Sequence, residues 1–505
     1  MPSRHMVLAL LIGLFVGAYA IAAEDSGQAP AAPAKIAVTE TVLGKVDEVI
    51  PDSLAISPDQ RHVAYAAKRG EKSVVVLDGQ DGPQYDAIGE GAPVFSPDSQ
   101  HFAYAAKSGD KFVVVADGKE EADKYDGIVK GSFLYSPAMN RLAYVAKSGE
   151  KSVVVVDGVT GKEYMTVGNL MFTPDSRRIV YFGQNGQRFC VVVNGVEGKE
   201  YSHLGGVVIS ADSKHVAYYG FTQSGVVLVT DGAEGGKCES IQEVIYSPDS
   251  AQVAYIGFID KKWAVVVDGK AGKGYDSIDQ DSLVFSADGK HFVYAAWMRD
   301  KGDKRAVVLD GVEGKVYDSI ADIILTPDGH VGYLAMAGSK HCLVVDGVEG
   351  ADCGYFISGS LAVSPDSMRW GFRGLADNKA VMIVDGAAGK GYDFVGGLVF
   401  SADSKRAAYW AETGKEAFAV VDGAEGKHYI YESVVEPVVF SPDSKHVAYR
   451  PKRNGKMLIN VDGAETAEYS GAVPGSRVVF DGPGVCHALM QKENEMVLVE
   501  IEAGQ

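Results

Sequence analysis

Histidine is the side chain in this sequence best suited to bind a metal ion or to transfer protons near neutral pH. Five of the histidines share one context, because each follows a Ser-Pro-Asp or similar turn by a few residues. A context that recurs along a chain places one histidine in each copy of a repeated unit, too far from the others to share one metal ion. We therefore expect exposed turn histidines, and no metal site, at His62, His101, His215, His291 and His446.

Tyr-Asp pairs recur in the same manner and mark one strand position of the repeat, where packing and a polar cap explain them. They are Tyr85-Asp86, Tyr125-Asp126, Tyr275-Asp276, Tyr317-Asp318 and Tyr392-Asp393. The sequence has no G-x-S-x-G nucleophile elbow, no H-E-x-x-H zinc helix and no G-x-x-x-x-G-K-[ST] phosphate loop. We therefore predict no catalytic residue, metal site or cofactor, although a site assembled from separate repeats stays open.

A repeated unit of about 40 residues occupies most of the chain, a period typical of arrays and propellers. Its marker is a Ser/Thr-Pro/Ala-Asp turn. The second residues of these turns are Pro58, Pro97, Pro137, Pro174, Ala211, Pro248, Ala287, Pro327, Pro365, Ala402 and Pro442, with Pro137 in a degenerate copy.

Each unit divides into four short strands by alternation and turn residues. In the unit that begins at Leu283 the strands read LVFS, HFVYAA, RAVVLD and KVYDSI. The Pro-Asp turn joins the first two strands, and an Asp-Gly turn, where glycine supplies the positive φ of a hairpin, joins the last two. The third strand is apolar on both faces, as expected where one sheet packs against the next.

The stretch FSPDSKHVAY at residues 440–449 resembles the signature of WD40-like, TolB-type propeller repeats, and the resemblance covers nearly all of residues 44–503. It implies an all-β fold of four-stranded blades and no particular activity, because many functions share this motif. The second half of the repeat, VVVDGxEGKxYD, differs from the corresponding part of that family's repeats. It is distantly similar to quinoprotein repeats, best at residues 157–164, but tyrosine stands where those repeats favour tryptophan, so we expect no quinone cofactor.

Eleven turns predict eleven blades, and the two ends of the chain supply a twelfth. Residues 44–50 align with a fourth strand, and residues 477–480, 486–491 and 496–501 align with strands one to three. Because ordinary propellers have about four to eight blades, we predict tandem propellers, as two six-bladed rings at residues 44–270 and 271–505. The strand at 44–50 would close the first ring near Gly269, and a strand at 272–278 would close the second. Five plus seven blades, divided near Gly232 or Gly311, is the alternative.

The N-terminus has the pattern of a secretory signal peptide over residues 1–23, with Arg4 and His5 before an apolar run and Ala20-Ile21-Ala22 at the cleavage site. An uncleaved anchor is the alternative. Residues 24–43 are predicted to be a flexible leader, and the mature chain is expected to be periplasmic or secreted without a membrane span. The net charge of −19 at pH 7 disfavours nucleic acid as a partner.

Two of the five cysteines, Cys342 and Cys353, flank the turn at residues 346–350 and are predicted to lie opposite each other. An oxidising compartment would favour a disulfide between them, and two buried thiols are the alternative. Cys190 and Cys238 occupy the same two repeat positions in successive blades, so they cannot pair across one hairpin.

The connection between strands two and three varies most among the copies, and function is expected where copies differ. Early copies read AKRGEKS or AKSGEKS, whereas later ones carry aromatic, methionine and arginine side chains typical of interface hot spots. We predict a non-enzymatic scaffold that binds a protein, peptide or glycan at this face, the alternative being a lyase or hydrolase of extracellular polymers with a pocket at a propeller channel. The predicted face comprises Phe182, Phe221, Phe258, Trp297, Met298, Arg299, Arg373, Trp410, Arg450 and Arg453.

Overall fold

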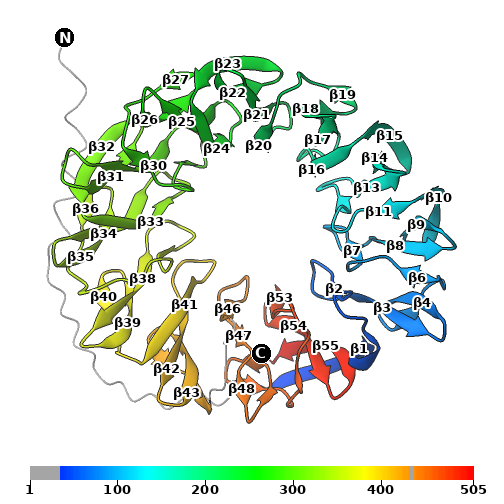
Figure 1. Ribbon diagram of the computed structural model, residues 1–505. Coiled ribbons are helices and arrows are strands. Elements are labelled where there is room, and N and C mark those ends of the chain that lie inside the picture. Colours follow the sequence, from blue (N-terminus) through cyan, green and yellow to red (C-terminus); the bar gives the residue numbers. More distant parts are fainter. Residues whose placement is uncertain (1–34, 431–436, 505) are drawn as a thin grey trace. The chain divides into compact units, whose positions relative to one another are not determined.

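The computed structural model describes residues 35–430 and 437–504 of the chain (Figure 1). Strands dominate it, and within the described residues the only helical element is the 3-10 helix η1 (Val46–Glu48). The strands form twelve sheets of four or five strands, which we number blades 1 to 12 in chain order, and a small two-stranded sheet. The predicted all-β propeller of four-stranded blades is confirmed.

The first strand of each blade is short, divided in two, or paired with a shift in register. These strands are β2 (Ala55–Ile56), β6 (Ala87–Ile88) with β7 (Val94–Phe95), β11 (Gly127–Ile128) with β12 (Leu134–Tyr135), β16 (Thr166–Phe172), β20 (Leu204–Ile209), β24 (Ser240–Tyr246), β28 (Ser277–Ile278) with β29 (Val284–Phe285), β33 (Ser319–Leu325), β37 (Ala362–Val363), β41 (Phe394–Phe400), β46 (Val439–Phe440), and β52 (Gly471–Ala472) with β53 (Val479–Gly482).

The second strand pairs with both neighbours and is buried along most of its length. The second strands are β3 (Val63–Arg69), β8 (Phe102–Ser108), β13 (Leu142–Ser148), β17 (Ile179–Asn185), β21 (Val216–Thr222), β25 (Val253–Ile259), β30 (Phe292–Met298), β34 (Val331–Ala337), β38 (Trp370–Ala376), β42 (Ala407–Thr413), β47 (Val447–Tyr449) and β54 (Val485–Lys492).

The third strand is the valine-rich one. The third strands are β4 (Lys72–Leu77), β9 (Lys111–Ala116), β14 (Lys151–Val156), β18 (Arg188–Val193), β22 (Gly225–Thr230), β26 (Lys262–Val267), β31 (Lys304–Leu309), β35 (Lys340–Val345), β39 (Lys379–Val384), β43 (Glu416–Val421), β50 (Asn460–Val461) and β55 (Glu495–Ala503).

The fourth strand forms the outer edge of each blade. The fourth strands are β5 (Gln80–Asp81), β10 (Lys119–Tyr125), β15 (Val159–Tyr164), β19 (Val196–Glu197), β23 (Ala233–Cys238), β27 (Lys270–Ala271), β32 (Val312–Tyr317), β36 (Val348–Glu349), β40 (Ala387–Ala388), β44 (Ala424–Glu425), β51 (Ala464–Glu465) and β1 (Ile36–Lys45). Strand β45 (Tyr429–Ile430) pairs with β43, and β48 (Lys452–Arg453) pairs with β49 (Lys456–Met457).

The hydrophobic core lies between the blades. Each of twelve clusters of buried apolar residues combines the facing sides of two consecutive blades, since the third strand is apolar on both faces. Strand β14, for instance, is buried at Ser152, Val153, Val154 and Val155. Every blade is therefore stabilised mainly by its two neighbours.

The two ends of the chain complete blade 12 together, whereas two-ring closure had predicted that each end would pair with a strand near residue 270. Strand β1 pairs antiparallel with β55, from Ile36 opposite Ala503 to Lys45 opposite Glu495, and the two strands lie side by side in Figure 1. A core cluster then joins blade 12 to blade 1 and closes the ring. The N-terminal strand lies at Ile36–Lys45 rather than at residues 44–50, so the end of the predicted flexible leader is a paired strand. The predicted signal peptide lies outside the described residues.

The strand exchange predicted to close two six-bladed rings is not formed. Strand β27 pairs with β26 of its own blade 6, and Tyr275 bridges to Trp263 of that blade, so no open edge remains there for the N-terminal strand. Blades 6 and 7 share a core cluster of buried residues across the predicted boundary at residue 270. Blades also share cores across Gly232 and Gly311, the alternative boundaries. The twelve described blades therefore follow one another in a single series, which is closed by the pairing of β1 with β55.

Candidate functional site

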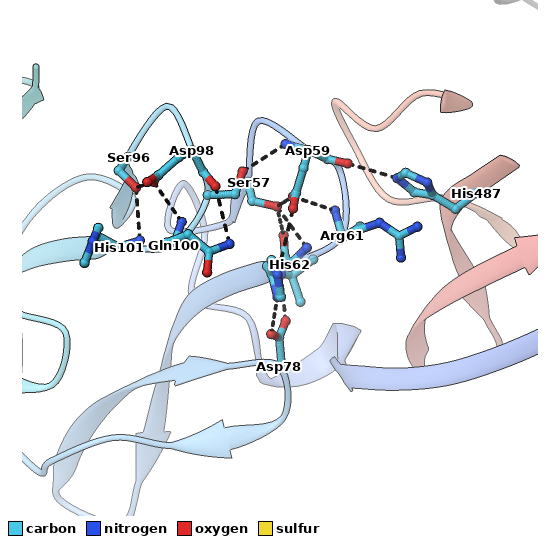
Figure 2. Close-up of polar contacts among 12 residues, drawn as sticks. Ser57, Asp59, Arg61, His62, Asp78, Ser96, Asp98, Gln100, His101 and His487 are labelled. Atoms are coloured by element: carbon cyan, nitrogen blue, oxygen red, sulfur yellow. Dashed lines mark hydrogen bonds and ion pairs between the residues drawn. The ribbon is translucent and has the colours of Figure 1, made fainter. Parts of the chain in front are cut away.

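The turn histidines hold the two hairpins of their own blade together. Nδ1 of His62 lies 2.7 Å from Oδ2 of Asp78, which begins the turn between strands three and four, and Oδ1 of the same carboxylate accepts the N–H of Val63 (Figure 2). The other four predicted histidines, and also His330, make the same contact with an aspartate of their blade. Arg141, Arg369 and Arg406 replace histidine in this position elsewhere. The role of these histidines is thus structural.

The Ser-Pro-Asp turn is fixed by its own side chains and by the next blade. Ser96 and the N–H of Gln100 donate hydrogen bonds to Asp98, which hold the pKa of that carboxyl below its usual range (Figure 2). The N–H of Asp59 donates to Ser99 Oγ of blade 2 over 3.0 Å. The same bond joins turn residues Ala138, Asp175, Asp212, Asp366 and Asp403 to Ser176, Ser213, Ser250, Ser404 and Ser444.

A second link between blades lies along their outer strands, and we call it the outer clasp. It consists of a lysine and a tyrosine near the fourth strand of one blade and a glutamate in the next blade. At blades 4 and 5, Glu234 accepts hydrogen bonds of 2.8 Å from both Lys199 and Tyr201. The lysine bond recurs at Glu197, Glu313, Glu349, Glu425 and Glu465, and Tyr469 donates to Glu40 across the ring closure.

The aspartates of the Tyr-Asp pairs form a third link, on the edge of the blades where strands two and three connect. Oδ1 of Asp276 accepts a bond of 2.7 Å from Lys262 in its own blade, and Oδ2 accepts the N–H of Arg299 in the next blade over 2.8 Å. The lysine and the N–H hold the pKa of Asp276 below its usual range. Asp86, Asp126, Asp318 and Asp393 make the same two contacts. The strand 2–3 hairpins of these five blades are therefore docked on the preceding blade.

The structure divides the predicted binding face into buried and exposed residues. Met298, Trp410 and Arg450 are buried, with 3%, 4% and 1% of their surface exposed, so they cannot belong to an open binding surface. Met298 and Trp410 pack in the cores between blades, and Arg450 donates to Ser476 of blade 12. The sequence had predicted that these residues lie in connecting loops, whereas Met298 ends β30 and Trp410 lies within β42.

Three further residues of the predicted face are already engaged within the chain. Phe182 is half-buried against the core between blades 4 and 5. Arg373 donates to the carbonyl oxygen of Val395 and lies over the ring of Phe394. Arg453 forms ion pairs of 2.9 Å with Glu465 and Glu468.

The remaining predicted residues lie at the strand 2–3 hairpins of three consecutive blades, and the third link holds the hairpin of blade 7. Phe221 is 39% exposed in blade 5. Phe258 is half-buried in blade 6, and in blade 7 the guanidinium of Arg299 lies 4.8 Å from the ring centroid of Trp297. The carbonyl oxygens of Phe258 and Trp297 accept N–H groups from residues that precede their blades, Glu239 and Asp276.

Two aromatic residues that the sequence analysis did not select extend this group. His203 is exposed and contacts Phe221, with ring centroids 6.0 Å apart, and Trp263 lies 5.0 Å from Phe258. Trp263 stands where blades 1 and 3 have Ser73 and Ser152 and blade 2 has Phe112, and this variation was the signal available in the sequence. We define the hairpin surface as His203, Phe221, Phe258, Trp263, Trp297 and Arg299.

The predicted disulfide does not match the register of its hairpin. The turn falls at Asp346-Gly347, with φ of 50° and 77°, so Val345 pairs with Val348. The N–H of Cys353 then donates to the carbonyl oxygen of His341, the neighbour of Cys342. Both cysteines are free thiols, and the Cys353 thiol donates to the same carbonyl oxygen over 3.0 Å.

The described part of the chain contains no cluster of three or more His, Cys, Asp or Glu side chains able to hold a metal ion. Within the same residues, no helix has the length and apolar character needed to cross a membrane.

No protein-family model and no curated protein sequence matches the chain. Solved structures resemble it at low identity. The crystal structure of the eukaryotic initiation factor aligns over 73% of this chain and 96% of that chain, with 13% identity and a TM-score of 0.34. The crystal structure of the tricorn protease aligns over 83% of this chain and 58% of that chain, with 12% identity and a TM-score of 0.26.

Proposed function

We propose that this chain is an exported, non-enzymatic scaffold that binds a protein, peptide or glycan partner at the hairpin surface. The observation that carries the proposal is the exposure of aromatic and arginine side chains on the hairpins of consecutive blades, with Phe221 39% exposed and Arg299 held over Trp297. Tryptophan, tyrosine and arginine are enriched among residues that dominate binding energy at interfaces.

Order in the free protein supports the same function. Arg299 donates its N–H to Asp276, and the N–H of Phe221 donates to the carbonyl oxygen of His203, so these hairpins are held before a partner arrives. A surface that is ordered in advance loses less conformational entropy on binding. The corresponding hairpins of blades 1 to 3 carry mainly charged and small residues, and Phe112 in blade 2 is their one aromatic residue.

We also propose that the protein is exported and that it is related to TolB-like propellers. The signal-peptide pattern at residues 1–23 supports a periplasmic or secreted location, and FSPDSKHVAY supports kinship with TolB-like propellers. Mass spectrometry of the mature protein tests the first point, with a new N-terminus expected near Ala23 or Glu24. A full-length N-terminus would contradict it.

The binding proposal is tested by capture from the envelope fraction and on a glycan array with the purified mature chain. Phe221→Ala and Trp297→Ala should each weaken capture of the same partner by about ten-fold, the effect of a loss of about 1.4 kcal/mol. Glu150→Ala is the matched control, because Glu150 is exposed at the corresponding hairpin of blade 3. Capture that is equal for wild type and both variants would show that the hairpin surface is not the binding site.

A further inference from the structure

The interface between blades 8 and 9 lacks both halves of the outer clasp. In blade 8, Ala351 stands in the lysine position and Cys353 in the tyrosine position, as shown by the bond from the Cys353 N–H to His341. In blade 9, Ala388 pairs with Ile383 and stands in the position of the clasp glutamate. The polar residues that join neighbouring blades elsewhere are therefore replaced by small ones on both sides.

A cavity of about 780 Å³ occupies this interface. It lies between β35 and β36 of blade 8 and β38 to β40 of blade 9, strands that are adjacent in Figure 1. Its apolar lining includes Leu343, Trp370, Phe372, Val381 and Ile383. The core cluster here has five buried members, against twelve at blades 6 and 7, so apolar side chains do not fill the space left by the clasp.

Blades 5 and 6 show that loss of the clasp is accompanied elsewhere by a fuller core. There Cys238 stands in the tyrosine position and Ala271 in the glutamate position. However, the Cys238 thiol donates to the hydroxyl of Tyr255 over 3.9 Å, within a cluster of nine buried residues. In blade 9, Phe372 replaces that tyrosine and brings no hydroxyl group. The 8–9 interface is thus both apolar and underfilled.

The rim of the cavity is acidic. Glu349 is neutralised by Lys315 and Lys340, and Asp385 by Arg369, the one basic residue of the lining. Asp352 and Asp377 are also lining residues, and neither forms an ion pair with a described residue. Oδ1 of Asp352 accepts the N–H groups of His341 and Gly354. These backbone N–H groups, and to a smaller extent the charges of His341 and Lys340, hold the pKa of Asp352 below its usual range, so Asp352 is ionised, and Asp377 adds a second carboxylate to the lining of the apolar cavity.

We propose that this cavity binds a small organic cation with an aromatic or branched aliphatic body. Its volume lies within the range of about 300–1,000 Å³ typical of small-molecule sites. The apolar body would occupy the space that the tyrosine of the clasp fills at other interfaces. Trp370 and Phe372 belong to the lining, and aromatic rings attract cations. Asp352 and Asp377 would balance the charge of the ligand. This site is independent of the hairpin surface.

The test uses two dyes of opposite charge on the whole mature chain: thioflavin T, a cation, and 8-anilinonaphthalene-1-sulfonate, an anion. Thioflavin T should bind at one site, at least about ten-fold more tightly than the anion. The variant Ala351→Lys/Cys353→Tyr/Ala388→Glu rebuilds the clasp of the other blades in the cavity. It should weaken thioflavin T binding by at least about ten-fold while circular dichroism shows a folded protein.

A second variant keeps the test decisive if the triple variant fails to fold. Asp377→Lys reverses an exposed charge of the rim and should weaken thioflavin T binding by about ten-fold. Its matched control is Asp260→Lys, because Asp260 holds the same hairpin position in blade 6, with φ of 49° against 50°. Absence of thioflavin T binding, equal binding of both dyes, or equal effects of the two lysine variants would overturn the proposal.

Discussion

The hydroxyl of Tyr392 in blade 9 donates a hydrogen bond of 2.9 Å to Oε1 of Glu425 in blade 10, and Lys390 lies 2.7 Å from the same oxygen. This outer clasp adds a polar link to the apolar core that the two blades share. Because each blade packs on its neighbours, the stability of the ring is approximately a sum of nearest-neighbour contributions. A single clasp should therefore have a measurable and local effect.

Removing one clasp hydroxyl should destabilise the protein modestly. Tyr392→Phe deletes the donor to Glu425 and should lower the free energy of unfolding by about 0.5–1.5 kcal/mol, the usual contribution of one hydrogen bond. Denaturant titration measures it. Tyr355→Phe is the matched control and should change nothing, because Tyr355 is 49% exposed. Equal losses for the two variants would show that the clasp bond does not contribute.

The clasp glutamates predict loss of stability in acid. Lys273 and Lys301 lower the pKa of Glu313 to about 2, and Lys315 and Lys340 lower that of Glu349 to about 2, from 4.5. A carboxyl whose pKa is lower in the folded state stabilises the fold fully above pH 4.5, and this contribution is lost as the pH falls towards 2.

Melting temperatures measured between pH 6 and pH 2 should therefore fall mainly below about pH 4.5. Glu313→Gln cannot titrate, so its melting temperature should lie below that of wild type at pH 6 and approach it at pH 2. A constant difference across this range would contradict the assignment of the lowered pKa to Glu313.

Deleting residues 36–45 should destabilise the whole ring. The deletion removes the fourth strand of blade 12, exposes the edge of β55 and takes away Leu43, which packs in the core with blade 1. We expect a lower melting temperature in one transition. The control is Thr39→Ala at an exposed position of β1. Two transitions, with one at the wild-type temperature, would instead indicate two separate rings.

Local features of the blades could be predicted from the sequence, and long-range ones could not. Asp-Gly turns and valine-rich strands act within about 40 residues, so blade count and strand order follow from them. Ring closure depends on the small rotation between blades, accumulated over the whole chain, and no local pattern encodes it.

The prediction that Trp410 and Met298 belong to an exposed binding face was wrong because the ends of their strands were placed too early. Side chains alternate in direction along a strand, so a strand that extends a few residues further than expected buries some of them. His203 was missed because it lies before strand one, outside the variable connection. Trp263 is the last residue of that connection in its copy and was not among the predicted residues, although it lies within strand three. Aromatic residues at repeat positions that are polar in other copies would have pointed to them.

The last prediction concerns Cys342 and Cys353 in the mature protein. The two-residue turn at Asp346-Gly347 and the bond from the Cys353 N–H to the His341 carbonyl oxygen place Cys353 beside His341. Neighbouring residues of a strand point to opposite faces of the sheet, so Cys342 and Cys353 are not directly opposed across the hairpin. Cys342 instead packs in the core between blades 7 and 8.

Peptide mapping of the unreduced protein, after alkylation in denaturant, should therefore recover Cys342 and Cys353 as separate free thiols. Both thiols should also react slowly with alkylating reagents in the native state, because burial raises the pKa of Cys342 and raises that of Cys353 to about 11, which leaves little reactive thiolate. Denaturation supplies the control, since both cysteines should then react at the rate of an ordinary thiol. A peptide that links the two residues would show that the hairpin adopts the other register, with its turn at Gly347-Val348.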